Sequence, residues 1–345
     1  MNERGDSATL DSSHKFRLSV FQEDWWLGIV RKTNSVGEVR VSQDNVVLGC
    51  LTYDRGARMG IRIGSVPWSH VTAPVLNQSL TQGQKEKVLK ELIAGLPRGN
   101  SYVFVCEQNS PDRELIREAF RRARKFHERI QPTFVQRLDD KDVMERLTGR
   151  DKGNINSAVR ALDIAEISAD DFIKLYAANL KEADKKLYYP LSIARELITE
   201  GMVRNQILVY AARDKPAGSI VPAEERPFHT AVAFAIDDMG NPLQEKRIYA
   251  WMVTYGRKSH RAAVKLIFVA GMRYAQKHGL IFDADGAISE RHIELYNKKM
   301  GIPHREERIQ FVGLTRVARA YWTIRPFVPR FIPQLTRQLS AALKL

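Results

Sequence analysis

The 345-residue chain contains few cysteines, ordinary amounts of glycine and proline, and no long apolar run. Its two cysteines, Cys50 and Cys106, exclude a disulfide-stapled scaffold and cannot alone complete a structural zinc site. Twenty-one glycines and 14 prolines are close to average usage, which excludes collagen-like and disordered chains. The best apolar run, 262–272, is interrupted by Lys265 and is shorter than the ~20 residues of a membrane span. Because segment 1–14 is polar and mixed in charge, it does not resemble a secretory signal, and we expect a soluble cytoplasmic protein.

Size and composition favour two folded domains. The chain exceeds the ~100–200 residues of a single domain, and 44% hydrophobic with 27% charged residues is typical of a globular protein. Each half also has the order strand–strand–strand–helix–strand–helix–strand, without visible sequence identity between the halves. We therefore expect an α/β protein of two tandem domains, 1–150 and 151–315, with mixed sheets flanked by helices and a C-terminal tail over 316–345.

The expected elements follow from alternation for strands and from helical periodicity for helices. In the first half we expect strands between Gly37 and Gly64, a helix over Gln84–Leu96, a strand over Ser101–Cys106, a helix over Asp112–Lys125 and a strand over Gln131–Leu138. In the second half we expect strands over Gln206–Arg213, His229–Asp237 and Arg247–Tyr255, a helix over Ser259–His278, a strand over Leu280–Asp283, a helix over Ser289–Met300 and a strand over Glu307–Leu314. Helices over Asp140–Leu147, Ile155–Glu166 and Ser168–Lys186 are expected to link the halves.

The net charge of +14 does not by itself indicate a nucleic-acid partner. The densest basic cluster, Arg113–Arg129, is better explained as a solvated helix face with Glu–Arg pairs one turn apart. Neither an RNA-binding aromatic signature nor a zinc-finger spacing accompanies it. Nucleic acid is therefore not expected as a partner, and transfer RNA stays only as an alternative.

Three segments resemble the FemAB-like transferases, a tandem-domain group within the GNAT (N-acetyltransferase) superfamily. Arg62–Leu76 is similar to the family's loop after its early strands, and Lys152–Ser168 resembles the interdomain helix with an Arg160-Ala161 pair. Arg261–Gly301 carries the strongest likeness, with a helix, a strand ending in Phe-Asp-Ala-Asp-Gly and a second helix. The resemblance extends over roughly residues 20–315. It implies two tandem GNAT-like domains, a degenerate first one and a second one that binds the donor and catalyses acyl transfer.

The sequence departs from the family pattern at two places. Ala284 stands where an aromatic residue is usual, and Met300-Gly301 replaces Phe-Gly. The long helical-hairpin arm of members that use aminoacyl-tRNA on cell-wall precursors is also missing. The resemblance therefore implies acetyl-CoA or another acyl-CoA as the co-substrate, and as acceptor an amine of an amino acid, an amino sugar or a lipid-linked envelope precursor.

The junction before the longest helix of the second half is the expected donor site. Phosphates are bound by backbone N–H groups at helix N-termini, with cations nearby, and in the GNAT layout the pyrophosphate of CoA lies at this junction. The alternative is a charged, solvated helix cap. The expected donor-binding residues are Tyr255, Gly256, Arg257, Lys258, Ser259, His260 and Arg261.

Catalytic side chains are expected at the end of the following strand and on the next helix. Asp283 and Asp285 are two residues apart, which places both on one side of an extended chain. A paired carboxylate there with a raised pKa would accept the amine proton; the alternative is an Asx-Gly turn at Gly286. Tyr296 matches the family's proton-donating tyrosine, although it precedes Gly301 by five positions instead of four, and a buried core tyrosine is the alternative.

The C-terminal tail carries six basic residues and no acidic one over 316–345. Aromatic and aliphatic residues alternate with these cations, and 334–345 has the pattern of a short amphipathic helix. Two readings stay open: residues 318–345 contact the inner face of an anionic membrane, or they pack on the second domain.

The sequence therefore predicts an N-acyltransferase that moves an acyl group from CoA to an amine. No histidine or cysteine spacing fits a metal site, so no metal is expected. Two alternatives stay open: a catalytically inactive GNAT-fold scaffold or binding protein, and an aminoacyl-tRNA-dependent transferase of the FemAB type.

Overall fold

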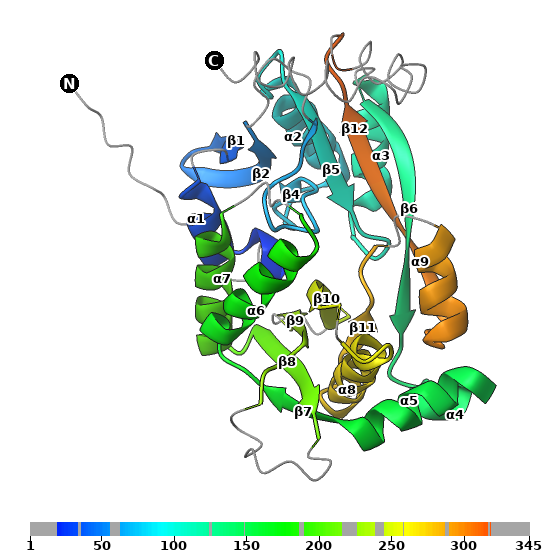
Figure 1. Cartoon of the computed structure of the whole chain (residues 1–345). Coiled ribbons are helices and arrows are strands. Elements are labelled where there is room, and N and C mark those ends of the chain that lie inside the picture. The colour runs from blue at the N-terminus through cyan, green and yellow to red at the C-terminus, as the bar shows by residue number, and fades with distance from the viewer. Residues whose placement is uncertain are drawn as a thin grey trace, which may run out of the picture.

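The fold is taken from a computed structural model of the chain. It describes residues 19–33, 36–55, 63–123, 126–147, 149–185, 190–215, 226–238, 245–257, 259–286, 290–316 and 318. The chain forms the expected mixed α/β architecture, with sheets flanked by helices (Figure 1). Lys258 and, apart from Ala318, the tail 318–345 lie outside the described residues.

The first half contains three helices and six strands among the described residues. After a short 3₁₀ turn (Val20–Gln22) they are α1 (Asp24–Arg31), β1 (Val36–Gln43), β2 (Val46–Asp54), β3 (Ile63–Gly64), β4 (Val75–Leu76), α2 (Gln82–Ala94), β5 (Ser101–Cys106), α3 (Arg113–Arg122) and β6 (Phe126–Gln136).

The second half begins with helices and ends with a long strand. Its described elements are α4 (Val143–Arg146), α5 (Gly149–Ala161), β7 (Leu162–Glu166), α6 (Ala169–Glu182), α7 (Leu191–Val203), β8 (Ile207–Asp214), β9 (Thr230–Asp237), β10 (Arg247–Tyr255), α8 (Ala263–Lys277), β11 (Ile281–Asp283), α9 (Glu290–Glu294), a π-helix (Leu295–Lys299) and β12 (His304–Gly313).

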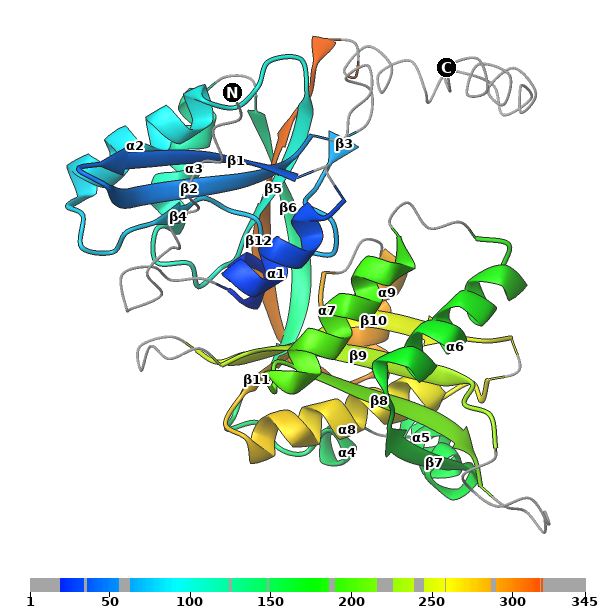
Figure 2. The same ribbon diagram turned by 90° about the vertical axis from the view of Figure 1, so that its left-hand side faces the viewer.

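One continuous sheet joins the two halves. Its strand order is β3-β5-β12-β6-β11-β10-β9-β8-β7, and β1, β2 and β4 form a separate small sheet. The last strand, β12, lies between β5 and β6 of the first half and is antiparallel to both (Figure 2). Its Phe311 stacks on Phe120 of α3 with ring centroids 4.4 Å apart, so the first-half core needs this strand. The sequence pattern assigns β12 to the second domain, whereas its pairing lies with strands of the first.

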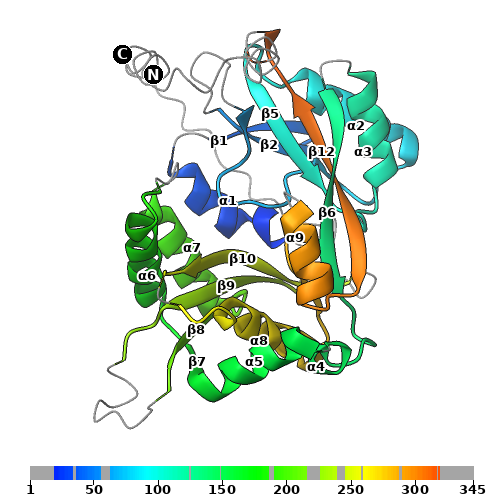
Figure 3. The same cartoon turned by 45° about the vertical axis from the view of Figure 1, so that its right-hand side comes forward.

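Helices cover both faces of the second-half sheet (Figure 3). On one face Phe234 of β9 packs with Phe268 of α8, and on the other Ala233 lies in a core shared with α1, α6 and α7. All of β9 is buried, which explains its continuous apolar sequence.

Several expected elements differ in the structure. Residues 162–166 form strand β7 rather than the end of a helix, because they pair with Asp214–Tyr210 of β8 at the sheet edge. Helix α8 begins at Ala263, four residues after the expected Ser259. Two helices that were not expected, α1 and α7, pack against each other and bury Trp26 and Leu197.

Candidate active site

Strands β10 and β11 separate near the middle of the sheet. They pair in parallel only where Arg247–Tyr249 lies beside Ile281–Asp283, after which β11 ends and β10 continues to Tyr255. Past Tyr249, no described strand pairs with this edge of β10. Opposite this edge, β10 carries a bulge between Ala250 and Met252 against β9. Bulges and open strand edges of this kind are common beside active sites, so the end of β11 is the candidate centre.

Asp283, at the end of β11, is completely buried. Thr133 of β6 donates its hydroxyl to Oδ1 at 2.5 Å, and Nη2 of Arg308 lies 2.9 Å from Oδ2. Arg247 contributes a longer contact of 3.4 Å to the same oxygen. The carboxylate is therefore fixed by groups from three strands and has little freedom to exchange partners.

Asp285 follows in a left-handed backbone conformation with φ of 62°. Its N–H donates to Oδ1 of Asp283 at 2.8 Å, so the Asx turn that the sequence left open as the alternative is present. Its carboxylate contacts Arg308 and lies 2.9 Å from Nδ1 of His70. Burial alone would raise the pKa of Asp285, but the contacts with His70 and Arg308 outweigh it and hold the pKa below its usual range. The expectation of a raised pKa is therefore wrong for Asp285, which the guanidinium of Arg308 helps to keep ionised.

The same ion-pair network continues into both halves. Nη2 of Arg247 on β10 lies 2.9 Å from Oε2 of Glu306 on β12. Arg308 lies 3.9 Å from Glu107 at the end of β5, and the hydroxyl of Tyr249 donates to Oε1 of Glu107 at 2.9 Å. We call Glu107, Arg247, Asp283, Asp285, Glu306 and Arg308 the junction network; it ties β5, β10, β11 and β12 together.

Asp237 lies beside this network as a buried carboxyl at the end of β9. Burial, followed by the nearby charges of Glu107 and Glu23, raises its pKa well above the ordinary value, while an N–H from Val20 donates to it. The folded state therefore binds this proton more tightly than the unfolded state, and the group costs stability as the pH rises above its unfolded pKa.

We predict that Asp237→Asn stabilises the fold by about 1–3 kcal/mol at pH 8, because the amide keeps an acceptor for Val20 and needs no ionisation. The gain over the wild type should shrink toward pH 4. Urea unfolding at both pH values measures it, with the exposed neighbour Asp238→Asn as the control. A gain that is equal at both pH values, or absent, would contradict the prediction.

Tyr296 lies in a π-helix, and this explains its unusual spacing. A π-helix contains more residues per turn than an α-helix, so the π-turn absorbs the additional residue before Gly301, whose φ is 63°. The ring of Tyr296 packs near Phe134 at 6.2 Å and Phe268 at 6.3 Å. Burial, and then the charges of Asp285 and Asp283, raise the pKa of Tyr296, so its phenol keeps its proton. The structure thus brings Asp283, Asp285 and Tyr296 together.

The expected donor loop lies at the far end of β10, and the N–H groups of Gly256 and Arg257 already have partners. The N–H of Gly256 donates to His229 O and to Ser259 Oγ, both at 3.0 Å. The N–H of Arg257 donates to Oε2 of Glu182 at 3.0 Å, so a carboxylate occupies the position expected for a phosphate. Ser259 is therefore a loop residue and not the cap of α8, where Nδ1 of His260 accepts from the N–H of Ala262.

The side chains of this loop are more accessible to a ligand than its backbone N–H groups. Tyr255 is 63% exposed, and Arg257 and Arg261 are exposed. Neither arginine forms an ion pair with a described residue. The loop therefore presents two cations and an aromatic ring to solvent.

Comparison with solved structures settles the fold. FemX shares 12% identity with a TM-score of 0.56, covering 88% of this chain and 94% of FemX. The C-terminal domain (DUF2156) of a putative lysylphosphatidylglycerol synthetase from Agrobacterium fabrum shares 12% identity with a TM-score of 0.52, covering 86% of this chain and 90% of that one. L-PGS from Bacillus licheniformis shares 10% with a TM-score of 0.50, covering 83% and 85%. No protein-family model and no curated protein sequence matches.

The chain has a FemAB-like fold. The fold resemblance inferred from the sequence is therefore confirmed. Within this FemAB-like fold, the end of β11 and the loop after β10 are the two places where the sequence predicts function.

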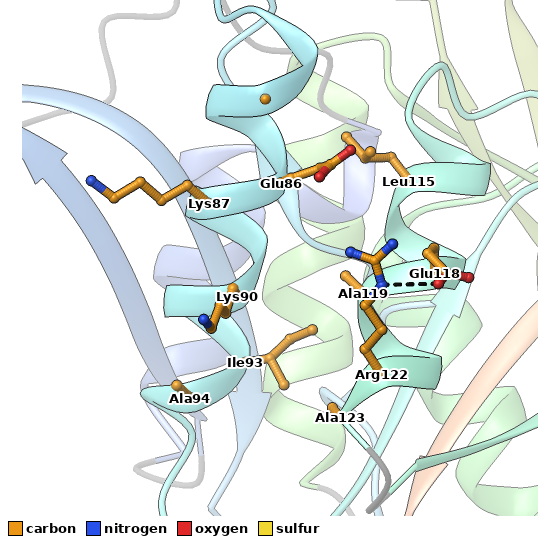
Figure 4. A pocket seen from close by; sticks show the side chains of 11 residues that line it. Glu86, Lys87, Lys90, Ile93, Ala94, Leu115, Glu118, Ala119, Arg122 and Ala123 are labelled. Atoms are coloured by element: carbon orange, nitrogen blue, oxygen red, sulfur yellow. Dashed lines mark hydrogen bonds and ion pairs between the residues drawn. The ribbon is translucent and has the colours of Figure 1, made fainter.

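A hollow on the first half is separate from both places. The groove between α2 and α3 encloses 720 Å³, with Lys87, Lys90 and Arg122 at its rim (Figure 4). A second hollow of 750 Å³ adjoins it at the start of both helices. The arginines of α3 are mostly paired, for example Arg122 with Glu118, as the solvated-face interpretation of Arg113–Arg129 predicts.

Two further chemistries find little support in the described part of the FemAB-like fold. Burial raises the pKa of the Cys50 and Cys106 thiols to about 12, which makes them poor nucleophiles. Among the described residues, no group of three histidine, cysteine or acidic side chains is placed to hold a metal.

No described helix is both long and apolar enough to cross a bilayer.

Sequence reasoning missed His70 and both arginines of the junction network. Arg247 and Arg308 occupy strand positions where a charge is normally exposed, and only the tertiary structure shows that they are buried with carboxylates. His70 lies within Arg62–Leu76, which carries the family likeness, but nothing in its local sequence indicates a contact with Asp285.

Proposed function

We propose that the chain is an N-acyltransferase that moves an acyl group from CoA to an amine at the end of β11. The observation that carries the proposal is the protonated Tyr296, which lies near enough to Asp283 and Asp285 for their charges to raise its pKa, inside a FemAB-like fold. The acceptor is an amine of an amino acid, an amino sugar or a lipid-linked envelope precursor, entering between the two halves. A contact of 318–345 with the inner membrane face belongs to the same proposal.

The open strand edge and the tyrosine supply two of the needs of acyl transfer. Attack on a thioester places negative charge on its carbonyl oxygen, and backbone N–H groups stabilise such an oxyanion effectively. Past Tyr249, β10 offers its edge without a described partner strand. The departing thiolate needs a proton, and a phenol that keeps its proton at neutral pH is a suitable donor.

The donor's phosphates would be held mainly by side chains. Arg257 and Arg261 are exposed cations without ion-pair partners among the described residues, and each charge-assisted contact contributes about 1.5–3 kcal/mol. The carboxylate of Glu182 on the N–H of Arg257 competes with a phosphate for the same position. Donor binding therefore requires Glu182 to give way.

The donor prediction is that Arg257→Ala with Arg261→Ala weakens CoA binding at least tenfold, whereas Glu182→Gln strengthens it several-fold. Calorimetric titration with acetyl-CoA measures both. Lys277→Ala, an exposed cation at the opposite end of α8, is the matched control and should bind normally. Unchanged affinity in the double variant would place the donor elsewhere.

A second candidate is an aminoacyl-tRNA-dependent transferase. Two observations favour it: the N–H groups of Gly256 and Arg257 are already occupied, and the similar folds include a domain of a putative lysylphosphatidylglycerol synthetase, whose name indicates that lysine is joined to a lipid. Repeating the titration with aminoacyl-tRNA separates the two donors. A protein that binds neither donor would instead be a scaffold that keeps the fold without the activity.

A further inference from the structure

His70 reaches across from the first half to the candidate site. It lies in the loop before β4, where its ring stacks on Phe21 with centroids 5.2 Å apart. Its Nδ1 lies 2.9 Å from Oδ2 of Asp285, while Arg308 contacts the other oxygen of that carboxylate. The aspartate is thereby fixed on one side by a guanidinium and presents its second oxygen to the imidazole.

The two ring nitrogens of His70 have different surroundings. Nδ1 is buried, and its contact with Asp285 has the distance of an ion pair but not the angle of a hydrogen bond. Nε2 has no hydrogen-bond partner among the described residues and is not one of the buried atoms, and the side chain is 23% exposed. Catalytic hydrogen bonds are often poorly aligned before substrate binds, so this geometry is compatible with an imidazole that accepts a proton once the substrate is bound.

We infer that His70 is the general base of the transfer and that Asp285 is its positioning residue, an assignment that rests on the proposed function. An imidazole whose inner nitrogen faces a carboxylate and whose outer nitrogen faces solvent is the arrangement by which His–Asp pairs accept protons. Asp283 and Asp285 themselves are held by Arg247 and Arg308. The base is then supplied by the first half and the rest of the site by the second.

Nε2 of His70 takes a proton from the acceptor amine as its nitrogen forms the C–N bond to the acyl carbon. The C–S bond of the thioester breaks, and the thiolate leaves with a proton from Tyr296. The imidazolium is stabilised by Asp285 through Nδ1, and transfer of its proton to solvent and reprotonation of the phenol reset the site.

The test measures turnover with acetyl-CoA and an amine acceptor in His70→Ala and in His70→Gln, which preserves most of the packing on Phe21. Both should lose ~10²- to 10⁴-fold in kcat with unchanged donor affinity, and added imidazole should restore part of the rate only in His70→Ala. Asp285→Asn should lower kcat and shift the pH profile of the rate. His304→Ala is the matched control, since Nε2 of His304 also lies 2.9 Å from a carboxylate, that of Asp140, outside the site.

The outcomes separate the inference from the proposed function. If the wild type turns over and kcat in both His70 variants stays within threefold of the wild-type value, His70 is not the general base. The proposed function then still stands. A wild type that transfers no acyl group from either donor overturns the proposed function and the role of His70 with it. Loss of activity in His304→Ala equal to that in His70→Ala would also overturn the assignment, because the effect would then not depend on the site.

Discussion

Replacing Arg308 with methionine should lower the free energy of unfolding by about 3–5 kcal/mol. The Arg308 side chain is 3% exposed, and its guanidinium contacts Asp283, Asp285 and Glu107, which come from both halves of the chain. Methionine fills a similar volume but leaves these carboxylates without their main counter-charge in a buried place. The cost of an unpaired buried charge, and not the loss of a contact, sets the size of the effect.

Urea unfolding of Arg308→Met measures this loss. Arg305→Met, on the same strand, is the matched control: its side chain is 54% exposed and 3.8 Å from Glu307, so its removal should cost less than about 1 kcal/mol. Equal and small effects in the two variants would show that the junction network contributes little to joining the halves.

Tyr296→Phe should lower kcat by ~10²-fold while the dissociation constant of the donor stays within twofold. Phenylalanine keeps the ring that packs near Phe134 and Phe268, so only the proton on the phenol is lost. A leaving thiolate can take its proton from water instead, which limits the effect to the contribution of general acid catalysis.

Steady-state kinetics and calorimetry on Tyr296→Phe separate the two quantities. Tyr274→Phe serves as the control, because Tyr274 stacks on His278 at the other end of α8. If kcat for Tyr296→Phe stays within threefold of the wild type, the phenol is a packing group and the leaving group is protonated by another donor.

Local elements could be predicted because each pattern is carried by neighbouring residues. The order of β8, β9, β10, α8 and β11 follows from apolar periodicity. Strand pairing cannot be predicted this way, because alternation shows which face is buried and not which strand lies beside it. The insertion of β12 between β5 and β6 is therefore a finding of the structure.

The same difference between local and long-range contacts applies to the candidate site. Asp283, Asp285 and Tyr296 lie close in sequence, at a strand end and on the next helix, so their meeting could be expected. The pKa direction of Asp285 depends on His70 and Arg308, which are distant in sequence or on another strand. The N–H of Arg257 is likewise occupied by Glu182 of α6, a contact that no local spacing predicts.

Mass spectrometry of an acyl-transfer reaction tests the central claim most directly. The full chain is incubated with acetyl-CoA and a panel of amino acids, amino sugars and lipid-linked amines, with aminoacyl-tRNA as the parallel donor. The account predicts an acylated amine and one equivalent of free CoA, formed faster than in the Tyr296→Phe and His70→Ala variants. No acylated product from either donor, with intact fold, would contradict it.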